Sequence, residues 1–291
     1  MDYVNKFETY LDEKKVSRST QSAYMADIQD FQVWLLSTGK PLEKAQVTDV
    51  ASYMERLSRD GKSLSTQNRK LASIKSFYGF MKKSGKMNNN PAEDIKTQKV
   101  ERNELEFLSV EEVEALLGAT DDSDKGLRDK ALLEMMYATG LRASEVCELK
   151  VSDLDLKIGY VNVVGTTKPR VVPIGKMARQ AVSEYLEKSR AKLLGAKEDS
   201  GILFLSYLGE KLTRQGVWKI LKFYGAKAGL EGKLSPQILR NSFAAHLIQN
   251  GADLKSLQEL LGHEDIMATK IYLSVSKNRI MDVYDKAFPR A

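Results

Sequence analysis

Residues 84–104 have no hydrophobic periodicity, and they separate two regions of the 291-residue chain that differ in pattern. This segment, SGKMNNNPAEDIKTQKVERNE, combines glycine, asparagine and proline with scattered charges, a composition typical of a linker. A chain of this length is long enough for two domains of ordinary size. We therefore predict one domain over residues 1–88 and a second over residues 105–291, joined by a linker over residues 89–104.

The region before the linker has the spacing of apolar residues that is typical of amphipathic helices. Val4, Phe7 and Leu11 share one face of a first short helix. A long helix is predicted to run from Ser65, as its N-cap, to Lys83. Two further helices are predicted between them, around Tyr24, Ile28, Phe31 and Leu35, and over residues 47–57. The N-terminal domain is therefore predicted to be small and helical.

The region after the linker mixes helical patterns with strand patterns. Residues 160–164 and 170–174 are rich in β-branched side chains and alternate, and the residues between them form a turn, which predicts a β-hairpin. Helices are predicted over residues 110–118, 125–138, 141–149, 176–194, 213–228, 236–249, 254–261 and 277–286. The predicted fold class is mainly α with a small β-hairpin or sheet: an N-terminal helical domain followed by a mixed α+β domain.

Cysteine and histidine are too scarce for a disulfide framework or for the commonest zinc sites. Cys147 is the only cysteine, and His246 and His263, the only histidines, lie 17 residues apart. No stretch approaches the ~20 apolar residues of a membrane span, and the N-terminus lacks the apolar core of a secretory signal. These features indicate a cytoplasmic protein that works without a metal ion.

Basic residues are concentrated in one part of the chain. The formal net charge is +6, and residues 56–102 contain twelve Lys and Arg against four Asp and Glu. Arg69, Lys70 and Lys75 lie beside the apolar face of the predicted long helix, where they could contact nucleic-acid phosphates. The alternative is an ordinary basic helix face in solvent. We take these three residues as candidate DNA contacts.

Two arginines lie near predicted helix starts. Arg142 follows the helix-ending Gly140, and Glu145, three residues later, can brace its guanidinium. Arg240 lies one turn after Gln237, so these two side chains share one helix face. Taken alone, each pair is also typical of an ordinary surface contact or helix start.

A histidine and a tyrosine follow these arginines. His263 comes directly after Gly262, which is predicted to end a helix, and Tyr272 lies nine residues further on. A tyrosine acts as a nucleophile only with help, because its ordinary pKa is ~10. Taken alone, the two residues are equally typical of a structural histidine and a packed aromatic side chain.

The order of these residues resembles that of the tyrosine recombinase (phage integrase) family, and most closely its Xer-type site-specific recombinases. The stretches ATGLRASEV and LRNSFAAHLIQNGADLKSLQELLGH, with the following IY, carry the resemblance, which covers both domains. It implies a SAM-like core-binding domain followed by a catalytic domain. It also implies an enzyme that cuts and rejoins DNA through a covalent 3′-phosphotyrosyl intermediate.

The resemblance assigns a role to each candidate residue. The two arginines would bind the non-bridging phosphate oxygens, the histidine would hydrogen-bond one of them, and the tyrosine would attack phosphorus. A lysine of the hairpin turn would protonate the leaving 5′ oxygen. The implied catalytic residues, with Glu145 in support, are Arg142, Lys168, Gln237, Arg240, His263 and Tyr272. Because two guanidiniums supply the positive charge that a metal would otherwise bring, no metal or other cofactor is expected.

Three positions depart from the family pattern. Gln237 stands where the family usually has histidine, and glutamine can donate a hydrogen bond but cannot carry a proton. Thr166 stands at the usual lysine position of the hairpin turn, which leaves Lys168 as the only lysine there. Asn241 replaces a common histidine at a position that supports the site. Two functions therefore stay open: an active strand-exchange enzyme, and a DNA-binding accessory protein of the same fold that cleaves poorly.

The resemblance also implies partners. These are double-stranded DNA at a specific site and a homo- or hetero-tetramer in which the helix over residues 277–286 docks on the neighbouring protomer, with a second recombinase or a DNA translocase as further candidates. The implied roles are resolution of chromosome or plasmid dimers, or integration and excision of a mobile element. The expected location is the cytoplasm, in association with the nucleoid.

Overall fold

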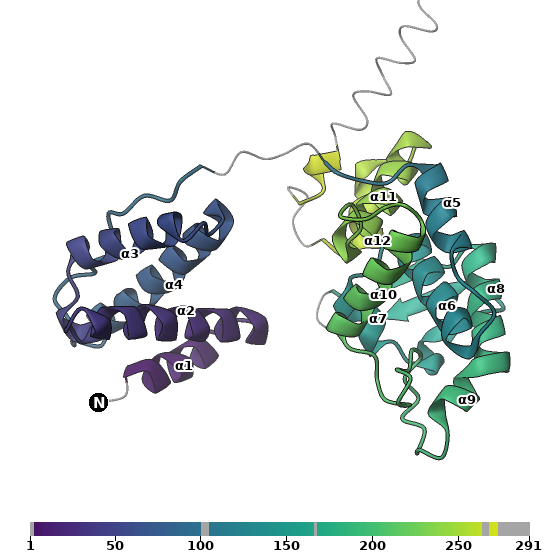
Figure 1. Ribbon diagram of the computed structural model, residues 1–291, viewed down its shortest axis with the longest axis horizontal. Coiled ribbons are helices and arrows are strands. Elements are labelled where there is room, and N and C mark those ends of the chain that lie inside the picture. Colours follow the sequence, from purple (N-terminus) through teal and green to yellow (C-terminus); the bar gives the residue numbers. More distant parts are fainter. Residues whose placement is uncertain (1–2, 100–104, 166–167, 264–267, 273–291) are drawn as a thin grey trace, which may run out of the picture. The chain divides into compact units, whose positions relative to one another are not determined.

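The structure is a computed structural model that describes residues 3–99, 105–165, 168–263 and 268–272 (Figure 1). The chain divides into two compact units, residues 1–102 and residues 103–291. Each unit has a hydrophobic core of its own, and each is described by itself. Among the described residues, no helix combines the length and the apolar content that crossing a membrane requires.

The first unit is built from helices. They are α1 (Tyr3–Glu13), α2 (Arg18–Ser37), the 3₁₀ turn η1 (Leu42–Lys44), α3 (Val47–Arg59) and α4 (Leu64–Lys83). The apolar faces predicted for them are confirmed: Val4, Phe7 and Leu11 of α1 are buried, as are Ile28, Phe31 and Leu35 of α2. Aromatic rings fill much of this core, with Phe7 edge-on to Phe77 at 5.3 Å between ring centroids.

The predicted N-cap of the long helix is wrong by two residues. Helix α4 begins at Leu64, and Ser63 is its cap: the Ser63 hydroxyl accepts a hydrogen bond from the Thr66 backbone N–H at 3.3 Å. An N-cap needs non-helical backbone, which Ser63 has at φ −57° and ψ 150°, whereas Ser65 already lies in the first helical turn. With serines at both positions, the sequence alone could not choose between them.

Part of the predicted linker packs against the first unit. Ala92 is fully buried in its core. The Asn68 side chain donates to the Gln98 carbonyl at 2.8 Å and accepts from the Gln98 backbone N–H at 3.1 Å. Asn90 also donates to the Lys75 carbonyl at 3.1 Å. The segment up to Gln98 therefore belongs to the first unit. It is held there by hydrogen bonds, which produce no hydrophobic periodicity in the sequence.

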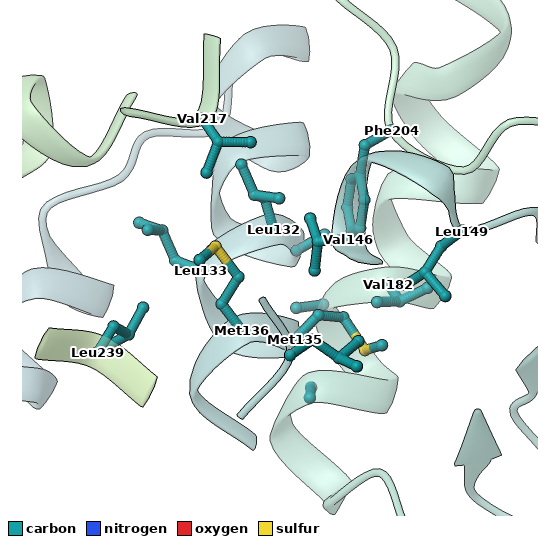
Figure 2. Close-up of a cluster of buried hydrophobic side chains, with 14 of the residues drawn as sticks. Leu132, Leu133, Met135, Met136, Val146, Leu149, Val182, Phe204, Val217 and Leu239 are labelled. Carbon is teal, nitrogen blue, oxygen red and sulfur yellow. The ribbon is translucent and has the colours of Figure 1, made fainter. Parts of the chain in front are cut away.

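The second unit surrounds a central helix, α6, which is buried along nearly its whole length. Figure 2 shows the core at this helix, where Leu132, Leu133, Met135 and Met136 of α6 meet side chains from several other elements. The described helices of the second unit are α5 (Val110–Gly118), α6 (Asp124–Thr139), α7 (Ala143–Glu148), α8 (Lys176–Tyr185), α9 (Ala191–Leu194), α10 (Arg214–Lys227), α11 (Pro236–Gln249) and α12 (Leu254–Leu261). The predicted helices are thus confirmed with small differences at their ends, except that the helix predicted over residues 176–194 is divided into α8, a π turn over Leu186–Arg190 and α9. The helix predicted over residues 277–286 lies outside the described residues.

A small antiparallel sheet completes the second unit. Strand β2 (Tyr160–Val163) pairs with β3 (Arg170–Pro173), which confirms the predicted hairpin, and with the two-residue strand β1 (Leu154–Asp155). The short β1 was not predicted, because two residues carry no detectable alternation. Val163 pairs with Arg170 in the register of the hairpin, so Arg170 is the first residue of β3 after the turn. Short turns precede β1 and follow α8 and α12: η2 (Val151–Asp153), the π turn η3 (Leu186–Arg190) and η5 (Lys270–Tyr272).

Candidate active site

A left-handed glycine sets the position of the first candidate arginine. Gly140 ends α6 at φ 59°, and a Cβ atom there would collide with the Phe243 ring, so both the conformation and the space require glycine. The chain then turns sharply, and Arg142 becomes the N-cap of α7. Its backbone N–H donates to Glu145 Oε2 at 2.8 Å, which ties the arginine to the first turn of that helix.

The carboxylate of Glu145 organises three guanidiniums. This side chain is only 1% exposed. Arg170 binds it bidentately, with Nη1 to Oε1 at 2.9 Å and Nη2 to Oε2 at 3.0 Å. Arg142 Nη1 lies 3.3 Å from Oε1, and Arg240 Nη1 lies 3.9 Å from Oε2. Because three positive groups share one negative group among the described residues, this part of the cluster carries a net positive charge that suits an anion.

Arg240 lies deepest in this cluster, at 3% exposure. Its Nη1 donates to the Gly140 carbonyl at 2.5 Å, and its Nη2 donates to the Leu261 carbonyl at 2.7 Å. Burial and then the charge of Arg142 lower the pKa of Arg240 to about 10. The guanidinium therefore stays charged at neutral pH, and it joins the end of α6 to the end of α12.

His263 faces the same arginine. Helix α12 ends in the left-handed Gly262, and the His263 ring follows with Nε2 3.1 Å from Arg240 Nη2 and Nδ1 2.9 Å from Thr269 Oγ1. Since a guanidinium can only donate, Nε2 accepts, and the hydrogen-bond pattern assigns a neutral ring with its hydrogen on Nδ1. Burial, followed by the charges of Arg240 and Arg142, lowers the pKa of His263 to about 4.

Tyr272 lies against α11 and is 1% exposed. It belongs to a small apolar cluster with Phe243 and Leu261. Its hydroxyl donates to Asn241 Oδ1 at 3.1 Å, and Gln237 Nε2 donates to the same oxygen at 2.8 Å. Burial raises the pKa of Tyr272, and the nearby positive charges of the arginines act in the opposite direction.

Lys168 is exposed next to the start of β3. Together with Arg170, Gly262 and His263 it lines a hollow of about 800 Å³ between β3 and α12. The sequence-predicted residues of the second unit thus fall into three groups. Arg142, Glu145, Arg240 and His263 form one hydrogen-bonded cluster, Gln237 and Tyr272 are joined through Asn241, and Lys168 lines the same hollow as His263.

The candidate DNA contacts of the first unit differ in their surroundings. Arg69 is 43% exposed and hydrogen-bonds Asp27. Lys70 is buried, and its ammonium lies 2.6 Å from Asp30 Oδ2 and 3.3 Å from Asp27 Oδ1. Lys75 is half-buried and donates to a backbone carbonyl at 3.1 Å. Lys70 therefore has the environment of an internal ion pair, whereas Arg69 keeps part of its side chain in solvent.

Arg170 belongs to the cluster but was not among the predicted site residues. Arg170 was predicted only as a strand residue, and its side chain proves to be 7% exposed and bound to Glu145. It also donates from Nε to the Leu260 carbonyl at 2.7 Å, so it connects β3 to α12. The available signal was a charged residue at the start of a predicted strand, which does not show which carboxylate it contacts.

Comparisons with known proteins agree over nearly the whole chain. The family described as "Phage integrase family" matches residues 106–279, and "Phage integrase, N-terminal SAM-like domain" matches residues 4–85. The chain is 42% identical over 284 residues to tyrosine recombinase XerD of Listeria innocua, covering 96% of this chain and 95% of the relative. It is 43% identical over 279 residues to a putative tyrosine recombinase of Caldanaerobacter subterraneus, covering 96% and 94%.

Solved structures share the fold. XerH site-specific recombinase, in a post-cleavage complex with a palindromic difH substrate, has a TM-score of 0.76 at 21% identity, covering 95% of this chain and 83% of that one. A lambda integrase dimer bound to a core site has a TM-score of 0.72 at 18% identity, covering 93% and 94%. XerA recombinase has a TM-score of 0.56 at 25% identity, covering 100% and 99%.

Proposed function

Because the chain belongs to the phage integrase family and is a Xer-type tyrosine recombinase, we propose that it performs site-specific recombination with Tyr272 as its nucleophile. The observation that carries this proposal is the cluster around Glu145. Arg142 and Arg240, far apart in the sequence, bring their guanidiniums to one buried carboxylate together with His263. Such a preorganised cationic site suits a phosphodiester, whose negative charge increases in the transition state.

In this proposal the arginines hold the scissile phosphate. A guanidinium presents paired N–H donors that match two phosphate oxygens. The side chain of Arg142 is 35% exposed and can turn toward DNA. The buried Arg240 would contribute positive charge to the phosphate-binding site from the interior of the domain. His263 would join them by donating to a non-bridging oxygen, which requires the hydrogen to lie on Nε2 instead of Nδ1. An incoming phosphate favours that change because it is an acceptor where Arg240 is a donor.

The cleavage step replaces one phosphate ester bond with another, so the number of such bonds does not change. The Tyr272 oxygen forms a bond to phosphorus, the bond from phosphorus to the 5′ oxygen breaks, and the phenolic proton leaves to solvent. Lys168 donates a proton to the departing 5′ oxygen, and the products are a 3′-phosphotyrosyl protein and a free 5′-hydroxyl. Attack by another 5′-hydroxyl reverses the same step and joins new strands. Gln237 can donate a hydrogen bond to the phosphate but takes no part in proton transfer.

We propose double-stranded DNA as the partner of both units. The XerH and lambda integrase structures that share this fold are complexes with DNA sites. In the first unit Arg69 and Lys75 are the proposed phosphate contacts, and Lys70 is assigned to the internal ion pair with Asp27 and Asp30.

The test is covalent capture on a suicide substrate. A duplex selected for binding from a random pool would be nicked next to the cleavage position, so that the released end diffuses away and the adduct accumulates. We expect an adduct on a denaturing gel with the wild-type chain and none with Tyr272→Phe, which keeps the ring and removes the hydroxyl. Lys168→Ala should slow adduct formation by about 10²–10⁴-fold if it is the general acid.

A negative result has a defined meaning. If the wild-type chain binds the selected duplex tightly and forms no adduct, the accessory, weakly cleaving function is favoured. Gln237→His then shows whether the missing histidine silences the site, because it restores the residue usual in the family.

The assembly is a separate proposal. We propose a tetramer on paired sites, held by the segment after Tyr272, in which Ile280 and either Val283 or Tyr284 have helical spacing. Truncation after Ser276 tests it: assembly on DNA should be lost in a native gel, while binding of one protomer to one site should remain. Unchanged assembly of the truncated chain would contradict the proposal.

A further inference from the structure

The nucleophile proposed above makes one described side-chain hydrogen bond, and its partner is a residue outside the catalytic set. The Tyr272 hydroxyl donates to Asn241 Oδ1 at 3.1 Å. Asn241 is itself 7% exposed and lies on α11 next to Arg240. The contact therefore joins the tyrosine to the same helix that carries the deepest arginine of the cationic cluster.

The amide of Asn241 is held in one orientation. Its Nδ2 donates to the Glu106 carbonyl at 2.9 Å, which directs the oxygen of the amide to the opposite side. That oxygen then accepts from Tyr272 and from Gln237 Nε2, at 3.1 and 2.8 Å. Both lone pairs of Oδ1 and at least one hydrogen of Nδ2 are thus used. Rotating the amide by 180° would break all three hydrogen bonds, so this orientation is favoured.

This arrangement opposes attack in two ways. A carboxamide oxygen accepts a hydrogen bond but cannot take up the proton, so it favours the phenol over the phenolate. Tyr272 is also 1% exposed, and a phosphorus atom of duplex DNA cannot approach its oxygen until the ring moves. The movement has to break the hydrogen bond to Asn241.

We propose that Asn241 is a positioning residue that holds Tyr272 in a resting position and thereby limits the rate of the first strand cleavage. The proposal rests on the proposed function, in which Tyr272 is the nucleophile. Gln237 and the Glu106 carbonyl act through Asn241, because they fix the orientation of its amide. Gln237 and Asn241, two positions at which this chain departs from its family, thus belong to the same hydrogen-bonded group around Tyr272.

The experiment measures two properties of Asn241→Ala and of the bulkier Asn241→Leu, which preserves packing. The first is the single-turnover cleavage rate on the suicide substrate at saturating protein. The second needs no DNA: nitration of Tyr272 by tetranitromethane, read by peptide mass spectrometry. We expect both to increase by about 3- to 10-fold, the range that the loss of one neutral hydrogen bond gives.

Two matched controls separate this role from a loosening of α11. Ser242→Ala removes the 2.8 Å hydrogen bond from the Leu108 backbone N–H, which lies in the same segment as Glu106, without touching Tyr272. Asn250→Ala removes an asparagine from the far end of the same helix, where its side chain donates to a backbone carbonyl at 2.8 Å. Both controls should nitrate and cleave at the wild-type rate.

The possible results decide the matter. An increase in both measurements for the two Asn241 variants alone supports the proposal. Unchanged nitration overturns it, as does equal acceleration by Ser242→Ala, which would make the effect a general loosening. Faster nitration with slower cleavage also overturns it, because Asn241 would then assist the attack. If the wild-type chain cleaves no DNA, the proposed function fails, and nitration still tests the hydrogen bond by itself.

Discussion

At the scale of single residues, the site depends on a carboxylate that does no chemistry. Glu145 is 1% exposed and neutralises part of the charge of Arg142, Arg170 and Arg240. Removing one partner of a buried ion pair is costly because the remaining charges lose their compensation without regaining water. The glutamate therefore allows three guanidiniums to lie close together in the absence of DNA.

Glu145→Gln is predicted to lower the free energy of unfolding by about 3–5 kcal/mol, because it keeps the shape of the side chain and removes its charge. Urea unfolding followed by circular dichroism measures the loss. The matched control is Glu148→Gln, on the same helix, whose carboxylate is 52% exposed and pairs with Lys211 at the surface. That variant should change stability by no more than about 0.5 kcal/mol, as surface pairs do. A similar loss in both variants would contradict the organising role of Glu145.

The buried His263 makes stability depend on pH. Its pKa is lowered to about 4 by burial and by the charges of Arg240 and Arg142, whereas an unfolded histidine keeps its ordinary value near 6.5. Between these values the unfolded chain binds more protons, so stability falls as the pH is lowered through this window. One proton gives a slope of at most about 1.4 kcal/mol per pH unit, and partial solvent screening makes it smaller.

The prediction is a flatter stability profile for His263→Gln than for the wild type between pH 6.5 and pH 4.5. Thermal melts at several pH values would measure it. His246 is the control, because its pKa is also lowered by burial although it lies away from the guanidiniums, near Tyr137. His246→Gln should leave the contribution of His263 in place, and equal profiles for wild type and His263→Gln would refute the assignment.

The structure brings together candidate residues that belong to a motif and one residue, Arg170, that belongs to none. Arg142, Glu145, Arg240 and His263 were predicted from their order along the chain, and the structure brings them into one cluster. Arg170 was missed because its partner is 25 residues away and meets it only through the packing of β3 beside α7 and α12. Tertiary contacts of this kind leave no local pattern.

At the scale of elements, the first unit is held by an ionic network between α2 and α4. Asp27 on α2 is 2% exposed and accepts hydrogen bonds from Arg69 and Ser73 on α4, with the Lys70 ammonium 3.3 Å away. Periodicity predicts an apolar face for α2 and cannot predict a buried carboxylate inside it. The same limit explains why Lys70 was read as a surface residue.

Asp27→Asn is predicted to destabilise the first unit by about 1–3 kcal/mol, because Arg69 and Lys70 lose a buried partner, although Lys70 keeps its pair with Asp30. The chain has two tryptophans, Trp34 on α2 and Trp218 on α10, so Trp218→Phe leaves a fluorescence signal from the first unit alone. Asp60→Asn in the same background is the control, since its carboxylate is 48% exposed and pairs with Arg56 one turn away. Comparable effects of the two substitutions would argue against the network.

At the scale of the whole molecule, the chain has separate cores in its two units. The core of the first unit gathers α1 to α4 with Ala92, and that of the second is centred on α6. A predicted linker followed from the lack of periodicity over residues 84–104, yet the structure keeps residues up to Gln98 on the first unit. What separates the units is therefore shorter than the aperiodic segment, because aperiodic chain can still pack through side-chain to backbone hydrogen bonds.

Two units on one chain predict a large gain in DNA affinity over either unit alone. Once one unit is bound, the other searches a small volume, and the effective concentration raises affinity by about 10²–10⁴-fold without any new contact. Residues 1–102 and 103–291, produced separately and checked for folding by circular dichroism, should each bind the selected duplex that much more weakly than the intact chain. Mixing the two fragments should not restore the affinity, because the covalent connection is missing. The intact chain should also show the steeper dependence of affinity on salt, since more phosphates are neutralised at once. If residues 103–291 alone bind as tightly as the whole chain and with the same salt dependence, the first unit does not contact DNA, and Arg69 and Lys75 are surface residues without that role.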